Sequence, residues 1–137
     1  MMAASLYIVV EGEDPGFDTF VNGRALARHE EALDKLANSL RVRSLLEFFS
    51  ADENSMAMVL EQEQEKQEWG VMLPRPQWFH AHEGLATVGS LLRYLEENPA
   101  ALGSESPAVR AELIEYETVL RKTEEQGLRW HLAVSFR

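Results

Sequence analysis

Alternation of apolar and polar residues marks both ends of the chain as strands. Residues 128–136 alternate strictly over nine positions. Their apolar positions form one face, made of Leu128, Trp130, Leu132, Val134 and Phe136. In residues 6–11, the four positions 7–10 are all β-branched or aromatic, and turn-forming residues around Pro15 follow the segment. Alternation of this kind indicates half-buried strands, so we expect the two segments to pair in one sheet.

Between these strands, three longer segments repeat apolar residues at helical spacing. They predict helices near residues 24–40, 83–97 and 107–126. Asn22 is the expected N-cap of the first helix, because its side chain can accept a hydrogen bond from a free N–H group. Gly127 stands where a glycine commonly ends a helix such as the third.

The middle of the chain gives weaker signals. Residues 42–49 are apolar enough for one or two helical turns, and residues 69–73 predict a short edge strand. Residues 50–68 include a polar, mostly acidic run without an apolar stripe, so we expect this part to be the least packed.

Together the elements predict an α+β fold: a small sheet formed by the N- and C-terminal strands, with three or more helices packed on one face. The length predicts a single domain over residues 1–137.

Charge and composition then narrow the class of protein. The chain carries 13 Lys and Arg against 23 Asp and Glu, a net charge of −10, and no cysteine. A strongly acidic balance argues against binding to nucleic acid or to an anionic membrane, and a chain without cysteine has no disulfide or thiolate metal site. The apolar run Leu6–Val10 is far shorter than the roughly 20 residues of a membrane span. The N-terminus lacks the basic start of a signal peptide, so we expect a soluble cytoplasmic protein of a bacterium.

A search for motifs that carry chemistry is negative for several classes. The sequence has no phosphate-binding loop, no dinucleotide fingerprint, no nucleophile elbow and no H-E-x-x-H helix. We therefore expect no cofactor.

One candidate site is the segment that contains Trp78, His80, His82 and Glu83. In an extended chain the two histidines project to the same side, as a metal chelate requires, and Glu83 could add an oxygen ligand or act as a base. The alternative is structural. Glu83 would then favour the positive end of a helix dipole, and Trp78 would help anchor the start of that helix against the core.

A second candidate is the polar face of the terminal strands. If the strands pair, Tyr7 and Glu11 share a face with Arg129, His131 and Ser135. These groups could hydrogen-bond a polar ligand or transfer a proton. The alternatives are a solvent-facing sheet, a face covered by the middle of the chain, or a dimer contact.

A metal site at His80 and His82 would need a third donor. Among the histidines only His29 and His131 are left, and nothing in the sequence obviously brings either to the start of the 83–97 helix. We therefore expect no transition metal there.

These observations favour a non-enzymatic binding or regulatory module, an acidic protein-interaction domain of the kind that acts as an inhibitor or immunity protein. Its expected partner is a basic protein, since complementary charge speeds encounter. The alternative is a small metal-dependent hydrolase centred on His80, His82 and Glu83.

Overall fold

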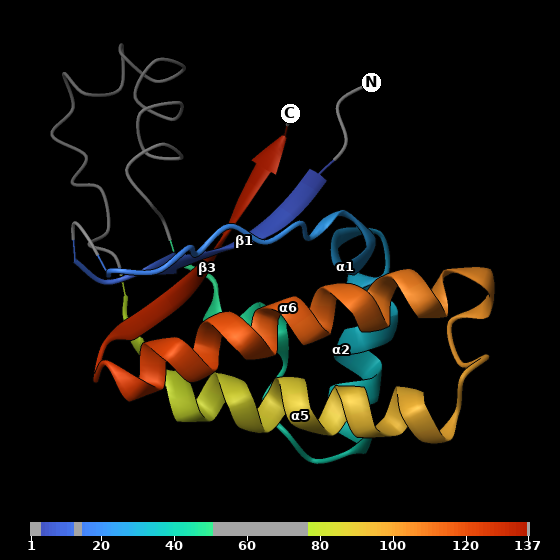
Figure 1. Cartoon of the computed structure of the whole chain (residues 1–137). Coiled ribbons are helices and arrows are strands. Elements are labelled where there is room, and N and C mark those ends of the chain that lie inside the picture. Colours follow the sequence, from blue (N-terminus) through green and yellow to red (C-terminus); the bar gives the residue numbers. More distant parts are fainter. Residues whose placement is uncertain (1–3, 13–14, 51–76, 137) are drawn as a thin grey trace, which may run out of the picture.

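The computed structural model describes residues 4–12, 15–50 and 77–136, and arranges them as a small sheet above a layer of helices (Figure 1). The elements follow in the order β1 (Ala4–Val10), α1 (Arg24–Arg28), α2 (Glu30–Ser39), η1 (Leu45–Phe48), β2 (Phe79–His80), α5 (Ala81–Glu97), η2 (Gly103–Glu105), α6 (Ser106–Glu125) and β3 (Arg129–Phe136). The α+β prediction is confirmed. None of the described helices is long and apolar enough to cross a bilayer.

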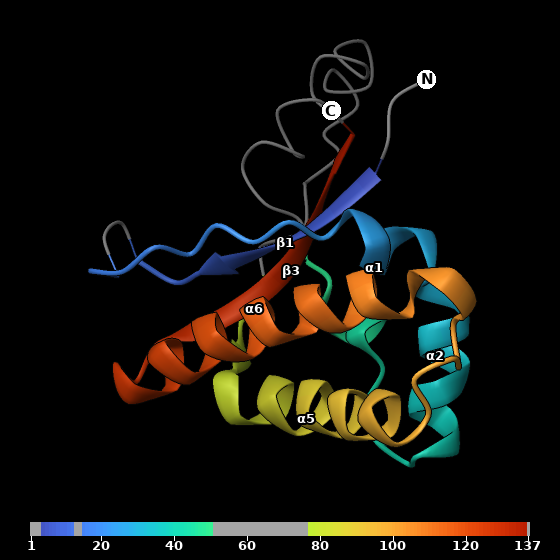
Figure 2. The ribbon, with the colours of Figure 1, turned by 45° about the vertical axis from the view of Figure 1, so that its right-hand side comes forward.

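The sheet has the strand order β1-β3-β2 among the described residues, and both pairings are antiparallel. The predicted pairing of the chain ends is therefore confirmed, with Val10 opposite Trp130 and Leu6 opposite Val134. The start of β1 and the end of β3 lie side by side beyond the helical layer (Figure 2). The third strand, β2, was not predicted. The expected edge strand at 69–73 lies outside the described residues, as does all of the 50–68 segment except Ser50.

The inner face of the sheet, which packs on the helices, carries the apolar residues of both alternating strands. Leu6, Ile8, Trp130 and Leu132 are all buried in one core cluster. The Trp130 indole stacks on Phe48 with ring centroids 4.9 Å apart. Its Nε1 donates to the carbonyl of His80 at 3.2 Å, so the largest core side chain also satisfies its polar atom.

Helix α5 can approach this indole because residue 84 is glycine. A Cβ at Gly84 would lie 2.3 Å from Cζ2 of Trp130, which is closer than any real carbon contact. Gly84 and Trp130 are both buried, so an added side chain at residue 84 could not avoid this contact by moving aside. The close contact between α5 and β3 therefore depends on the absence of a side chain at Gly84.

The predicted 24–40 helix is divided at His29, whose backbone leaves the helical region at φ −112° and ψ 23°. The N–H of His29 still donates to the carbonyl of Ala25 at 3.1 Å, so the division is a kink and not a loop. The expected N-cap was wrong: Gly23 occupies that position, and Asn22, one residue earlier, accepts from the N–H of Arg24, the first residue of α1. Gly127 follows the end of α6 as predicted, and its backbone is left-handed, with φ 67°.

Candidate functional site

Strand β2 brings the two candidate groups of the sequence together. His80 lies opposite Arg129 in the register, and Phe79 lies opposite Trp130. Side chains alternate along a strand, so His80 and Arg129 share the sheet face opposite the core. We call this the outer face; its candidate residues are Tyr7, Glu11, Trp78, His80, Arg129 and His131. The sequence did not show that His131 lies beside Trp78, because β2 was not predicted.

Arg129 and Glu11 form the charged pair of the outer face. Arg129 Nη2 donates to Glu11 Oε2 at 2.6 Å, and Arg129 Nε donates to Oε1 at 3.2 Å. These hydrogen bonds lower the pKa of the Glu11 carboxyl and raise the pKa of the Arg129 guanidinium. A carboxylate that is held ionised by two hydrogen bonds is poorly suited to accept a proton. We therefore assign Glu11 and Arg129 a role in holding each other in place, and do not assign Glu11 the role of a general base.

Trp78 and His131 form a second pair on the outer face. Their ring centroids are 4.4 Å apart, with the planes tilted by 30°. His131 Nδ1 lies 3.0 Å from the carbonyl of Gln77, which assigns the proton to that nitrogen. His131 is only 1% exposed, so its imidazole is a buried structural group and not one open to solvent.

His80 and His82 stack on each other with ring centroids 5.3 Å apart, so they lie on one side of the chain as predicted. His82 Nδ1 is 3.9 Å from Glu124 Oε1, and its side chain is 64% exposed. Glu83 faces elsewhere and pairs with Arg43, whose Nη1 lies 3.3 Å from Glu83 Oε2. The Glu83 carboxylate is therefore engaged by Arg43, whereas the hydrolase alternative assigns it to a site with the two histidines.

Tyr7 and Ser135 are the remaining residues predicted on the outer face. Tyr7 lies opposite Ala133 in the register and is partly buried. The side chain of Ser135, predicted on the same face, lies outside the described residues.

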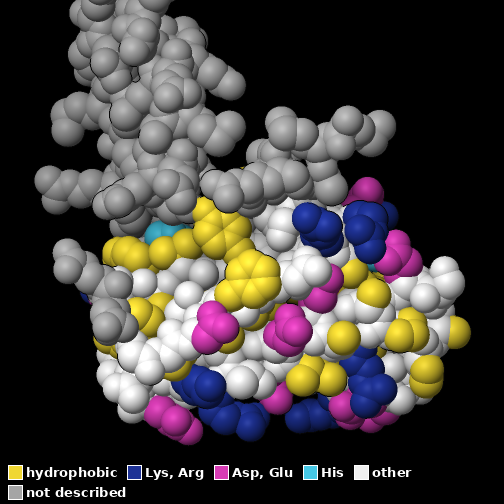
Figure 3. Space-filling view, turned by 45° about the horizontal axis from the view of Figure 1, so that its top comes forward, with side chains coloured by type: hydrophobic (Ala, Val, Ile, Leu, Met, Phe, Trp, Pro, Cys, Tyr) yellow, Lys and Arg dark blue, Asp and Glu magenta, His cyan; other side chains and the backbone are white. Residues whose placement is uncertain are grey.

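In the part of the chain that the structure describes, no three His, Asp or Glu side chains are grouped closely enough to hold a metal ion. Figure 3 tilts the top of the molecule toward the viewer and shows hydrophobic side chains interspersed with charges of both signs.

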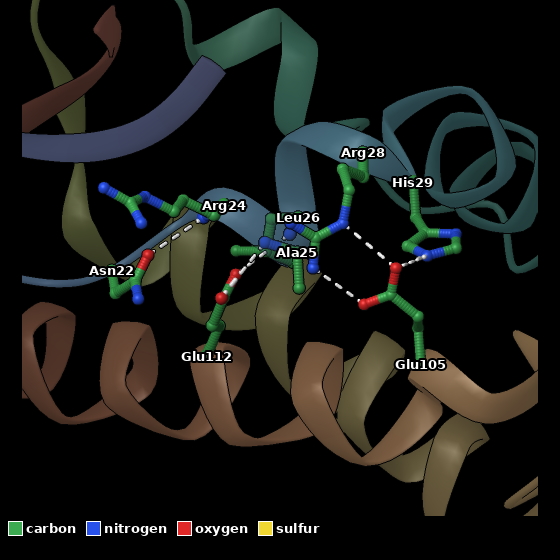
Figure 4. A network of polar contacts seen from close by, with 8 residues as sticks. All are labelled: Asn22, Arg24, Ala25, Leu26, Arg28, His29, Glu105 and Glu112. Atoms are coloured by element: carbon green, nitrogen blue, oxygen red, sulfur yellow. Dashed lines mark hydrogen bonds and ion pairs between the residues drawn. The ribbon is translucent and has the colours of Figure 1, made fainter. Parts of the chain in front are cut away.

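A second polar cluster, between α1 and α6, was missed by the sequence analysis (Figure 4). The Glu112 carboxylate accepts hydrogen bonds from the backbone N–H groups of Ala25 at 3.1 Å and Leu26 at 2.9 Å. Glu112 thus caps α1 from another helix, the task predicted for Asn22. The signal in the sequence is an acidic residue within the buried stripe of α6, between Val109 and Tyr116.

Three further polar contacts lie close to this junction. Arg28 binds the Glu105 carboxylate at two points, 2.7 Å and 3.0 Å, and His29 Nε2 lies 3.5 Å from the same group. The hydroxyl of Tyr116 donates to the carbonyl of Leu6, and burial raises the pKa of this phenol well above its usual value. Arg28 and His29 join α1 to Glu105 of η2, and Tyr116 joins α6 to β1, so we read the cluster as structural.

No protein-family model matches this chain, and no curated protein or solved structure matches it either. The functional argument therefore rests on the sequence and on the geometry of the described residues.

Proposed function

We propose that the chain is a non-enzymatic protein-interaction module that binds a basic partner protein through the outer face of its sheet. The observation that carries this proposal is the register of β2 on β3, which sets the candidate residues side by side across three strands. Their ionic and aromatic groups contact one another in pairs instead of converging on a reacting centre.

The composition of the outer face supports contact with a protein. Tryptophan, tyrosine and arginine are the residue types most enriched where single side chains dominate binding energy. Trp78, Tyr7 and Arg129 supply one of each. Trp78 is stacked on His131 and Arg129 is held by Glu11, so both would lose little conformational freedom on binding.

The charge of the whole chain supports a basic partner. A net charge of −10 on 137 residues raises the rate of encounter with a positively charged protein and disfavours an acidic one. Such encounter is weakened by salt, because screening shortens the reach of the field. An inhibitor or immunity protein that neutralises a basic toxin would use the same physics.

The test is capture of a partner from extracts of the source cells by purified variants. Arg129→Ala removes an exposed charge from the outer face, and Arg93→Ala removes an exposed charge from α5 as the matched control. We expect one basic protein to be retained by the wild type and by Arg93→Ala, lost with Arg129→Ala, and weakened by salt. Equal retention by all three proteins would reject the outer face as the contact.

A further inference from the structure

Asn22 and Gly23 lie directly before α1, and Asn22 is exposed to solvent. An asparagine followed by glycine is the pair most prone to deamidation, because glycine has no Cβ to shield its backbone nitrogen. That nitrogen attacks the side-chain Cγ of the asparagine. An N–Cγ bond forms, the Cγ–Nδ2 bond breaks, and ammonia leaves with the proton of the glycine nitrogen. Water then opens the succinimide ring to aspartate or, at the other carbonyl, to isoaspartate.

The fold holds in place the atoms that this reaction needs. Gly23 is buried, and its N–H donates to Ser5 Oγ at 3.4 Å. Its carbonyl oxygen accepts from the N–H of Leu6 at 3.1 Å and from the N–H of Ala27 at 3.0 Å. The amide oxygen of the preceding asparagine accepts from the N–H of Arg24 at 3.1 Å (Figure 4). The glycine nitrogen therefore has to leave Ser5 before it can react.

The backbone at Gly23 has no room for the isoaspartate product. A Cβ at this residue would lie 1.8 Å from the carbonyl oxygen of Leu6, so the main chain lies directly against β1. Isoaspartate adds one methylene group to the main chain, because the chain then runs through Cγ of residue 22. The added atom would displace Gly23 from its partners in this close-packed contact. An ordinary aspartate at residue 22 would leave the main chain unchanged.

We propose that Asn22 is a deamidation site that the folded chain protects, and that its isoaspartate product separates Gly23 from β1. Local opening of a folded chain frees its backbone groups for short intervals, and the reaction proceeds only in those intervals. The loss of ammonia makes each conversion irreversible, so the product accumulates with the time that this segment spends open. The inference does not depend on the proposed function, although β1 also carries Tyr7 of the outer face.

The first test follows the conversion of Asn22 by mass spectrometry of peptides from the whole chain, incubated at neutral pH. We expect conversion to be more than about tenfold faster in urea than in buffer, because several hydrogen bonds hold Gly23 in the fold. Ser5→Ala removes the acceptor of the Gly23 N–H and should speed conversion in buffer about fivefold, the factor for one ordinary hydrogen bond. Ser90→Ala removes a hydroxyl from α5 instead and should leave the rate unchanged. Equal rates in buffer and urea, or equal rates for the two variants, would overturn the proposed protection.

The second test isolates the isoaspartate form and measures hydrogen exchange at the Leu6 amide, which donates to Gly23. Exchange is expressed relative to the Leu91 amide of α5, so that a change in the whole fold is subtracted. We expect the isoaspartate form to exchange at Leu6 at least about fivefold faster than the unmodified chain. Asn22→Asp is the matched control, because it introduces the same charge without the extra backbone atom, and its Leu6 amide should exchange as in the wild type. Unchanged exchange in the isoaspartate form, or equal acceleration in both, would overturn the inference. Both tests use the whole chain without a partner, so neither decides the proposed function.

Discussion

The inner and outer faces of the sheet are built from alternate residues of the same strands, yet their side chains are held differently. On the inner face, Trp130 and Leu132 are fully buried and Gly84 makes room for the indole. On the outer face, Arg129 is 48% exposed and is held by one carboxylate. Trp130 is held by close packing and Arg129 by an exposed ion pair, so we expect substitutions around Trp130 to destabilise the protein far more than substitutions of Arg129.

The largest effect should follow from Gly84→Ala. Its new methyl group would meet the Trp130 ring inside a close-packed layer, and we expect a loss of about 3 kcal/mol in the free energy of unfolding. Gly89→Ala in the same helix is the control, because nothing lies within 4 Å of that position. It should be neutral or stabilise the protein by up to about 1 kcal/mol. Urea denaturation of both variants checks the difference, and similar stabilities would show that α5 does not pack as described.

A smaller effect should follow from Tyr116→Phe, which removes the hydroxyl that donates to the carbonyl of Leu6. We expect a loss of about 1.5 kcal/mol, because a buried acceptor is left without its donor. The phenol has a raised pKa in the folded state, so its contribution is complete below the pKa of an unfolded tyrosine. That contribution falls as the pH rises above about 10.

Unfolding free energies of the wild type and Tyr116→Phe between pH 8 and pH 11, about the range in which tyrosine titrates, test this linkage. The wild type should lose stability more steeply than the variant at the alkaline end. Parallel curves would contradict a buried, neutral phenol at this position.

The smallest effect should follow from Arg129→Gln on the outer face. The Glu11 carboxyl has a lowered pKa in the folded state, so its pairing stabilises the protein above the pKa of an unfolded glutamate and is lost as the pH falls. Both partners are partly exposed to solvent, so we expect only a small loss of stability at neutral pH. Between about pH 5 and pH 3 the variant should lose stability less steeply than the wild type. A loss as large as that of Gly84→Ala would remove the distinction between the two faces.

Local sequence patterns predicted helices and strands. The features that these patterns missed depend on contacts between residues far apart in the chain. Strict alternation over 128–136 was enough to identify β3 and its buried face. Strand β2 has only two residues, too few for alternation to indicate a strand. The register of β2 on β3 places His80 opposite Arg129. The sequence therefore contained the candidate residues of the outer face but not their arrangement.

The group that caps the start of α1 was not predicted, for a related reason. Asn22 has the right chemistry but lies one residue before the N-cap, and Glu112 on α6 reaches the N–H groups of Ala25 and Leu26 from 87 and 86 residues away. Local capping rules do not consider an acceptor supplied by another helix. The same limit applies to Gly84, whose role depends on Trp130, a residue far along the chain.

The central claim is that the outer face of the sheet binds a basic protein, and site-specific photo-crosslinking in the source cells tests it most directly. A photoreactive phenylalanine analogue is placed either at Trp78, on the outer face, or at Ile114, an exposed position on α6. The account predicts a discrete adduct with one basic protein from position 78 and none from position 114. Adducts from position 114 alone, or the same adducts from both positions, would contradict it.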